Sequence, residues 1–228
     1  MLVYGKQVVE YICQKHPEIV ETIYLSKEID KKLFGTFAKV AKIERVDNKK
    51  AQAMSRGGNH QGCLALITPL EFGSLDLVEN SSRVVILVGV SDVGNIGAII
   101  RTSYAYGVDV LVVAGLKSMN LEAVIRTSSG AALDMPIVLA PESGDLLNRL
   151  KHREFDLICA KAGAQSLSKL PTKWALLLGS EDKGIPKRFE KFCTTSLGIE
   201  MKNSFDSLNV SVAAGILIDR IVYGRDSK

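Results

Sequence analysis

Three short polar segments carry the side chains with which this sequence could do chemistry. The first is Ser91-Asp92-Val93-Gly94-Asn95-Ile96-Gly97, and Arg101 follows it by a little over one helical turn. The second is Gly179-Ser180-Glu181-Asp182-Lys183-Gly184, and the third is Ser207-Leu208-Asn209-Val210-Ser211. Glycines let backbone N–H groups come close to a ligand, and amide, hydroxyl and carboxylate side chains can hydrogen-bond it. The three segments therefore indicate a site that holds a small polar molecule.

Each segment also has an ordinary structural interpretation. Asn95 suits the N-cap of a helix, and the segment around Glu181 could be a surface turn. Ser207, Asn209 and Ser211 stand two residues apart just before an apolar run, which is typical of a well-capped helix. Three polar turns that follow the same kind of sheet favour a shared pocket over three unrelated turns.

The elements that must position these segments are visible in the second half of the chain. Continuous apolar runs occur at 84–88, 110–113, 137–139, 157–160 and 175–178, with helical segments between them. This alternation predicts an α/β domain with a parallel sheet covered by helices on both faces. Ligands bind beyond the carboxyl ends of the strands in such sheets, which is where the first two segments fall.

The first part of the chain predicts a separate, smaller α/β unit. Helical spacing occurs at 5–13 and 29–41, a short helix with Asn48 as its cap follows, and strands are expected at 22–25 and 63–67. A polar stretch with Pro69 and Gly73 then suggests a boundary. The expected organisation is a domain at 1–70, a linker at 71–82 and a second domain at 83–228.

Charge is concentrated in the first unit. The chain of 228 residues has a net charge of +4, and the stretch 27–50, with eight Lys/Arg and four acids, carries that same excess by itself. A basic surface suits a phosphate backbone, although a solvated helix face would explain it as well.

Composition restricts the class of protein. The chain is 46% hydrophobic and 24% charged, as expected for an ordinary globular protein. Cys13, Cys63, Cys159 and Cys193 are widely spaced and form no C-x-x-C pair, so neither a zinc site nor a disulfide framework is expected. They are predicted to be buried free thiols. No signal peptide or membrane-spanning run is recognisable, and we expect a cytoplasmic protein that binds neither membrane nor metal.

Two common nucleotide-binding motifs are missing. The spacing of Gly94 and Gly97 does not make G-x-G-x-x-G, and no G-x-x-x-x-G-K-[ST] occurs. An unrelated nucleotide-dependent enzyme, such as a dehydrogenase or a P-loop hydrolase, is therefore disfavoured.

Taken in order, the three segments resemble the motifs of the SpoU family of RNA ribose 2′-O-methyltransferases. The matching patterns are N-x-G-x-x-x-R, L-G-S-E-x-x-G and I-x-M followed by S-L-N-V-S-x-A, and the resemblance extends from Val84 to about Tyr223. The run Arg126-Thr127-Ser128-Ser129-Gly130-Ala131 is similar to the S-x-G-A turn of that family. Tyr4-Gly5 and Asn59-His60-Gln61-Gly62 resemble an RNA-binding domain like ribosomal protein L30e, which precedes the catalytic part in the branch that methylates guanosine in 23S ribosomal RNA.

This resemblance implies a fold, a cofactor and partners. The fold would be an α/β sheet with a C-terminal trefoil knot, of the SPOUT class, and the periodicity of the chain by itself shows no such knot. The cofactor would be S-adenosyl-methionine, the substrate RNA, and the working form a homodimer.

Roles also transfer residue by residue. Gly179, Ile199 and Leu208 would hold the adenosyl group. Asn95 and Arg101 would meet the ribose and its phosphate, with Arg126 as a further phosphate contact. Glu181, Ser207 and Asn209 would orient the groups around them. A guanidinium is a poor base because its pKa exceeds ~12, so we expect Arg101 to act electrostatically.

The sequence departs from the family pattern in two places. Glu200 stands where Pro is usual in the I-P-M stretch, and Val93-Gly94 replaces a common Pro before Asn95. Glu200 favours one alternative, a catalytically silent RNA-binding ribosome-assembly factor, whereas the intact site residues favour an enzyme. Ribosomal RNA is the preferred substrate because of the N-terminal unit, with transfer RNA as the other candidate.

Overall fold

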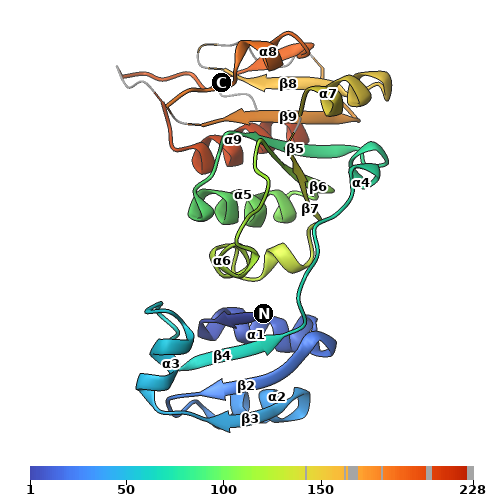
Figure 1. Ribbon diagram of the computed structural model, residues 1–228. Helices are drawn as coiled ribbons and strands as arrows, with labels where there is room; N and C mark the ends of the chain where they lie inside the picture. Colours follow the sequence, from blue (N-terminus) through green and yellow to red (C-terminus); the bar gives the residue numbers. More distant parts are fainter. Residues whose placement is uncertain (142, 162, 164–168, 181, 204–206, 225–228) are drawn as a thin grey trace. The chain divides into compact units, whose positions relative to one another are not determined.

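The computed structural model describes residues 1–228 except 142, 162, 164–168, 181, 204–206 and 225–228. Two compact units are present (Figure 1). The first comprises Met1–Glu71 together with Asn120–Leu133, and the second comprises Phe72–Met119 and Asp134–Lys228.

The first unit is a four-stranded sheet with helices, ordered β1-β4-β2-β3. Strands β2 and β3 are parallel, and β4 is antiparallel to both β1 and β2. Its elements are β1 (Leu2–Tyr4), α1 (Lys6–Lys15), η1 (Pro17–Ile19), β2 (Val20–Leu25), α2 (Lys31–Val40), β3 (Lys42–Arg45), α3 (Asn48–Met54), β4 (Cys63–Ile67), α6 (Leu121–Thr127) and η2 (Ala131–Leu133).

Helix α6 and η2 pack on this first unit, although the sequence grouped their residues with the C-terminal domain. The backbone N–H of Leu2 donates to Oε1 of Glu122 at 3.0 Å, so α6 lies along β1, an edge strand of the sheet. Gly130, at a φ of 97°, lies so close to the Tyr11 ring that a Cβ there would stand 2.5 Å from a ring carbon. These contacts join residues far apart in the chain, and no local pattern indicates them.

The second unit is built on six parallel strands in the order β10-β8-β9-β5-β6-β7. The predicted parallel sheet is thus confirmed. Its elements are α4 (Leu75–Glu79), β5 (Arg83–Val88), α5 (Val93–Ala105), β6 (Val110–Ala114), β7 (Ile137–Ala140), α7 (Ser143–His152), β8 (Asp156–Ala160), β9 (Trp174–Gly179), α8 (Lys187–Glu190), β10 (Thr195–Leu197) and α9 (Val210–Tyr223).

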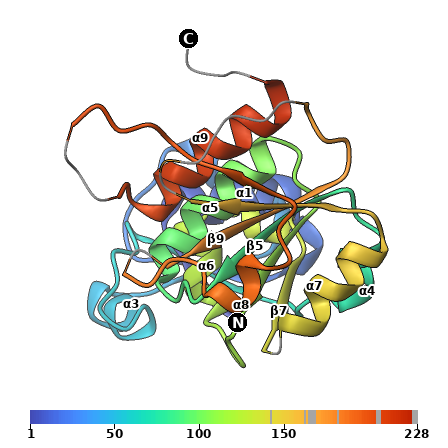
Figure 2. The same ribbon diagram turned by 90° about the horizontal axis from the view of Figure 1, so that it is seen from above.

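Helices cover both faces of this sheet. Figure 2 shows α5 and α9 on one side, with α4, α7 and α8 on the other. Alternate residues of β5 serve the two faces: Val84, Ile86 and Val88 join the core beneath α4, α7 and α8. The fully buried Val85 and Leu87 alternate with them and face the other way. The continuous apolar runs in the sequence follow from this double burial.

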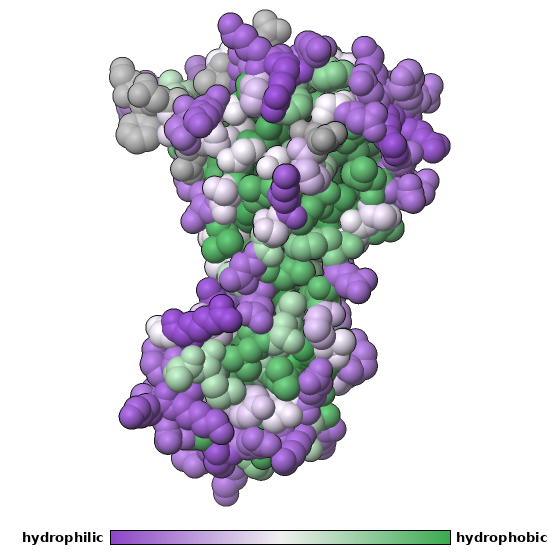
Figure 3. All heavy atoms as spheres, viewed as in Figure 1, coloured by the Kyte–Doolittle hydropathy of each residue, from purple (hydrophilic) through white to green (hydrophobic). Residues whose placement is uncertain are grey.

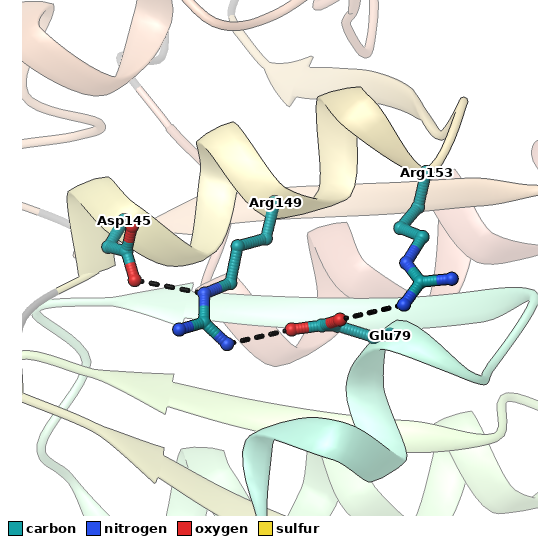
Figure 4. Close-up of polar contacts among 4 residues, drawn as sticks. All are labelled: Glu79, Asp145, Arg149 and Arg153. Atoms are coloured by element: carbon teal, nitrogen blue, oxygen red, sulfur yellow. Dashed lines mark hydrogen bonds and ion pairs between the residues drawn. The ribbon is translucent and has the colours of Figure 1, made fainter.

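An ion-pair network fastens α4 to α7. Glu79 accepts hydrogen bonds from Arg149 at 2.9 Å and Arg153 at 3.3 Å, and Arg149 also binds Asp145 at 2.9 Å (Figure 4). Asp145 and Arg149 stand four residues apart on one helix, where their side chains are neighbours. The network holds the segment that enters the sheet at β5.

Two predicted helix caps are wrong by a few residues. Helix α5 begins at Val93 with Asp92 as its cap, whose carboxylate accepts from the backbone N–H of Asn95 at 2.7 Å. Helix α3 is capped by Asp47, which accepts from Lys50 at 2.7 Å, and not by Asn48. In both cases the carboxylate accepts from the backbone N–H three residues later, the usual geometry of a cap. The side chain of Asn95 is then available to accept from Asn209.

The prediction of four free thiols is also wrong. Cys13 and Cys63 are free and buried, as expected, but Cys159 on β8 forms a disulfide with Cys193, which lies just before β10. Strands β8 and β10 are parallel neighbours in the sheet, and the two Cα atoms are 5.9 Å apart. This strand pairing brings together cysteines that are 34 residues apart in the sequence.

Candidate functional site

A cavity of about 180 Å³ opens in the second unit, at the carboxyl ends of β8, β9 and β10. It is far larger than the ~10–15 Å³ needed for one water. Most of its walls are aliphatic, and most of the polar groups are backbone. The lining residues are Ala160, Lys161, Leu178, Gly179, Ser180, Gly184, Leu197, Gly198, Ile199, Met201, Ser207, Leu208, Val210, Ala213 and Leu217.

Gly179 shapes one wall of this cavity. The loop after β9 turns back on itself, with a bridge between Ser180 and Gly184 and a hydrogen bond from the N–H of Gly184 to the Ser180 carbonyl at 2.8 Å. The Gly184 backbone closes over Gly179 so tightly that any Cβ at Gly179 would overlap it. Glycine is therefore required here by close approach, and it keeps the wall open to a ligand.

The segment after β10 forms the facing wall. Ile199 and Met201 line the cavity, and Glu200 between them is exposed and is not part of the described lining. Ser207 and Leu208, just before α9, complete the wall. All three residues predicted to hold a cofactor, Gly179, Ile199 and Leu208, thus line one cavity.

A hydrogen bond joins the first and third polar segments. The side-chain amide of Asn209 donates from Nδ2 to Oδ1 of Asn95 at 2.9 Å. The Oδ1 of Asn209 caps α9 by accepting from the N–H of Ser211 at 2.9 Å, and Ser211 Oγ donates to the same oxygen at 2.5 Å. The next residue along, Val210, belongs to the cavity lining. The Asn95–Asn209 pair therefore lies beside the cavity, where α5 packs against α9.

Two other predicted site residues, Arg101 and Glu181, are not among the described residues that line the cavity. Arg101 is on α5, six residues beyond Asn95, and its side chain is exposed and outside the described lining. Glu181 lies outside the described residues.

One residue that the sequence did not single out supports the cavity. Arg220 on α9 donates from Nη1 to the carbonyl of Gly198, a lining residue, at 2.6 Å. This bond ties the last helix to the wall after β10, and it satisfies a carbonyl beyond the strand end. A lone arginine on an apolar helix, eleven residues after the cap Asn209, gives no signal of this role in the sequence.

The described residues contain no group of three or more His, Cys, Asp or Glu side chains arranged to hold a metal ion. Among the same residues, no helix has the length and apolar character needed to cross a membrane.

Comparison with known proteins decides the family. The family model described as "SpoU rRNA Methylase family" matches residues 82–219, more than half of the chain and all of the described cavity lining. The chain belongs to the SpoU family. A second model, described as "RNA 2'-O ribose methyltransferase substrate binding", matches residues 2–73.

Relatives within the SpoU family align over nearly the whole chain. The 23S rRNA (guanosine-2'-O-)-methyltransferase RlmB of Haemophilus ducreyi is 30% identical over 236 residues, covering 96% of each chain. RlmB of Pseudomonas putida is also 30% identical, covering 99% of this chain and 97% of its own.

Solved structures show that the fold is that of SpoU methyltransferases. AviRb from Streptomyces viridochromogenes, in complex with AdoMet, superposes with a TM-score of 0.78 over 98% of this chain and 90% of its own, at 20% identity. An AdoMet-bound rRNA methyltransferase from Sinorhizobium meliloti gives a TM-score of 0.77 over 99% and 88%, at 22% identity.

The main SpoU departure in this sequence leaves the cavity unobstructed. Glu200 replaces a proline, but the residues on either side of it line the cavity and its own side chain is exposed. The substitution therefore changes backbone stiffness without adding a charge to the cavity wall.

Proposed function

We propose that this SpoU-family chain transfers a methyl group from S-adenosyl-methionine to the ribose 2′-hydroxyl of a guanosine in 23S ribosomal RNA. One observation carries the proposal: the segments that follow β9, follow β10 and precede α9 all line a single, mostly apolar cavity at the strand ends. The named activity of the full-length RlmB relatives gives the substrate class.

The cavity suits the cofactor by the chemistry of its lining. Leu178, Leu197 and Leu208 offer aliphatic contacts to a flat adenine ring. Gly179 and Gly198 expose backbone groups that can hydrogen-bond the ring edge and ribose. When bound, S-adenosyl-methionine supplies a methyl group that the ribose 2′-oxygen takes as the carbon–sulfur bond breaks and a neutral thioether leaves.

The chain's own residues align and stabilise the reacting groups. Asn95 and Asn209 hold each other beside the cavity and fix the entrance on the α5–α9 side. Holding the hydroxyl in line can supply roughly 7–11 kcal/mol of the barrier. Arg101, on the same helix as Asn95, stabilises the negative charge that develops on the 2′-oxygen. The proton of the 2′-hydroxyl goes to solvent. Glu181 and Ser207 orient these groups.

The domain roles, assembly and location belong to the same proposal. The first unit, residues 1–71 with 120–133, binds RNA, and the second unit, which includes α4 from the expected linker, holds the methyltransferase domain with its trefoil knot. The working form is a cytoplasmic homodimer. Helices α5 and α9 expose Tyr104 at 44%, Val212 at 51% and Tyr223 at 55%, which supports pairing through this face. The test is analytical ultracentrifugation: the wild type should sediment as a dimer and Val212→Asp as a monomer if two chains pair through this face.

The decisive experiment has two parts. Calorimetry measures S-adenosyl-methionine binding, and mapping of 2′-O-methyl positions compares ribosomal RNA from cells with and without this protein. We expect binding and the loss of one guanosine methylation. A chain that binds RNA but does not bind the cofactor and methylates no RNA would be the silent assembly factor. Methylation confined to transfer RNA would show that transfer RNA, and not ribosomal RNA, is the substrate.

A further inference from the structure

The first unit has one edge where most of its strands end and its helices begin. Strand pairing places Tyr4 opposite Leu64, and Leu25 opposite both Cys63 and Arg45. The last residues of β1, β2 and β3 therefore lie together, next to the first residues of β4, and α1, α2 and α3 all start from this edge. We call it the strand-end edge; in Figure 1 it is the side toward which the arrows of β2 and β3 point.

Positive charge collects on the strand-end edge. Its exposed cations lie at the strand ends, in the first helical turns and in the loop before β4: Lys27, Lys31, Arg45, Lys50 and Arg56. Three acids share the edge: Asp30 and Asp47 cap α2 and α3, and Glu28 pairs with Arg45 at 3.1 Å. Figure 3, in the same view, shows hydrophilic residues along this side of the unit. At the opposite edge, Lys15 and Lys39 stand in the last turns of α1 and α2, and the exposed acids Glu18 and Glu21 stand in η1 and at the start of β2. Most of the cations in the basic stretch 27–50 therefore lie on the strand-end edge.

An arginine from outside the N-terminal segment completes this edge. The guanidinium of Arg126 on α6 lies over the Tyr4 ring, with its central carbon 4.4 Å from the ring centroid. Both side chains are partly exposed. On the other side of Tyr4, the backbone of Gly58 is so close to the phenol that any Cβ there would overlap it. Arg126, Tyr4 and the loop at 56–62 therefore form one continuous surface.

Hydrogen bonds hold the shape of the loop at 56–62. The buried His60 accepts at Nδ1 from the N–H of Gly62 at 3.1 Å, and Gln61 Oε1 accepts from the N–H of Lys6 at 3.1 Å. Burial, with a smaller effect of the nearby Lys27 charge, lowers the pKa of His60, so the neutral form that accepts this bond is favoured. Arg56, Gly57, Gln61 and Gly62 all have positive φ. A turn whose shape is already fixed in this way loses little conformational entropy when it binds a ligand.

We propose that the strand-end edge binds the RNA substrate, with Lys27 and Arg56 on phosphates and the Arg126–Tyr4 stack as a platform for an unpaired base. The inference deepens the proposed function and rests on it. A planar guanidinium can pair with phosphate through two N–H groups and can stack on a base, and aromatic side chains support unstacked bases in RNA recognition. Residues 120–133 are then part of the RNA-binding surface, although they fall within the segment matched by the methylase model.

The first test compares two double variants of equal charge change. Lys27→Gln with Arg56→Gln removes two cations from the strand-end edge, and Lys15→Gln with Lys39→Gln removes two from the opposite edge. Binding to a 23S ribosomal RNA transcript is measured over a range of salt concentrations. We expect about tenfold weaker binding and a salt slope smaller by roughly one to two for the first pair only. Equal losses in both pairs, or no loss in the first, would overturn the proposal.

The second test separates stacking from charge. Arg126→Lys keeps the charge but loses the flat surface, so we expect RNA binding to weaken several-fold with little change in salt slope, whereas Arg126→Gln should lower both. Thermal melting checks the fold of each variant, and wild-type RNA binding by Arg126→Lys would refute the platform. Because S-adenosyl-methionine binding and methyl transfer by the wild type are measured separately, their failure would count against the proposed function and not against the RNA surface.

Discussion

Asn209 and Asn95 are joined by a hydrogen bond of 2.9 Å between side chains that are 114 residues apart in the sequence. Asn209 uses both ends of its amide: the oxygen caps α9, and the nitrogen reaches α5. The same residue thus caps α9 and joins it to α5 beside the cavity.

Two substitutions of Asn209 should separate these tasks. Asn209→Asp keeps an oxygen for the cap but replaces the donor that faces Asn95, so we expect nearly unchanged stability and clearly reduced methyl transfer. Asn209→Ala loses both, and should also cost about 1 kcal/mol of unfolding free energy. Chemical denaturation and single-turnover methylation measure the two effects. Full activity in Asn209→Asp would show that the bond to Asn95 is dispensable.

Gly179→Ala should damage the cofactor site. The added methyl would overlap the backbone of Gly184, so the loop after β9 must move and the cavity wall with it. We expect S-adenosyl-methionine binding to weaken at least ~10-fold in calorimetry, which corresponds to about 1.4 kcal/mol. Gly144→Ala is the matched control, because a Cβ at Gly144 meets nothing within 4 Å and a helical Gly→Ala change is neutral or stabilising. Unaltered binding in Gly179→Ala would contradict this account of the wall.

Arg101 variants test its proposed electrostatic role. Arg101→Ala should lower the rate of methyl transfer by ~10²-fold or more, the effect typical of losing one group that stabilises developing charge. Arg101→Lys keeps the charge but not the planar fork, and should remain well below the wild type. Cofactor affinity should be unchanged in both variants, because Arg101 is exposed and outside the described lining. Near-full activity of Arg101→Lys would rule out recognition by the fork.

The Glu79 network predicts a pH-dependent stability. Hydrogen bonds from Arg149, and then from Arg153, lower the pKa of Glu79. A carboxyl with a lower pKa in the folded chain stabilises the fold above its unfolded pKa, and this stabilisation is lost as the pH falls through the folded pKa. Glu79→Gln should therefore lower Tm at neutral pH, and the difference from wild type should shrink below pH ~4.3. Glu154→Gln, an exposed control in the same unit, should change little. If the difference in Tm between Glu79→Gln and the wild type persisted in acid, its cause would be packing and not the charge of Glu79.

The cysteines should divide into two classes. Denatured without reductant, the chain should show two thiols, Cys13 and Cys63, and after reduction all four cysteines should react. In the native state near neutral pH the two thiols should react slowly, because burial is the main cause that raises the pKa of Cys13 to about 11 and also raises that of Cys63. Four reactive thiols in the unreduced, denatured chain would contradict the Cys159–Cys193 pairing.

The Cys13 thiol also gives a stability trend at high pH. Its folded pKa lies above the ordinary value of 9.0, so the unfolded chain loses this proton first as the pH rises. The contribution of Cys13 to stability should therefore be intact below pH ~9 and decline toward a pH of about 11. Cys13→Ala should show a flatter decline in Tm over this window.

The sequence by itself determined the features that depend on neighbouring residues. The apolar runs that became β5, β6, β7, β8 and β9 identified the parallel sheet, because strands buried on both faces have no polar alternation. The polar residues before the last apolar run predicted a capped helix there, and one of them, Asn209, is the cap. The resemblance to the SpoU motifs implied that Gly179, Ile199 and Leu208 hold the cofactor, and all three line the cavity.

Only the tertiary structure decided which distant residues meet. The bonds from Asn209 to Asn95 and from Arg220 to Gly198, the Cys159–Cys193 disulfide and the packing of 120–133 beside β1 all link segments far apart in the chain. The helix starts at Val93 and Asn48 were likewise decided by which side chain reached the free N–H, Asp92 in one case and Asp47 in the other. Local periodicity carries no record of such partners, because they are selected by packing across the whole sheet and by the satisfaction of backbone groups at its ends.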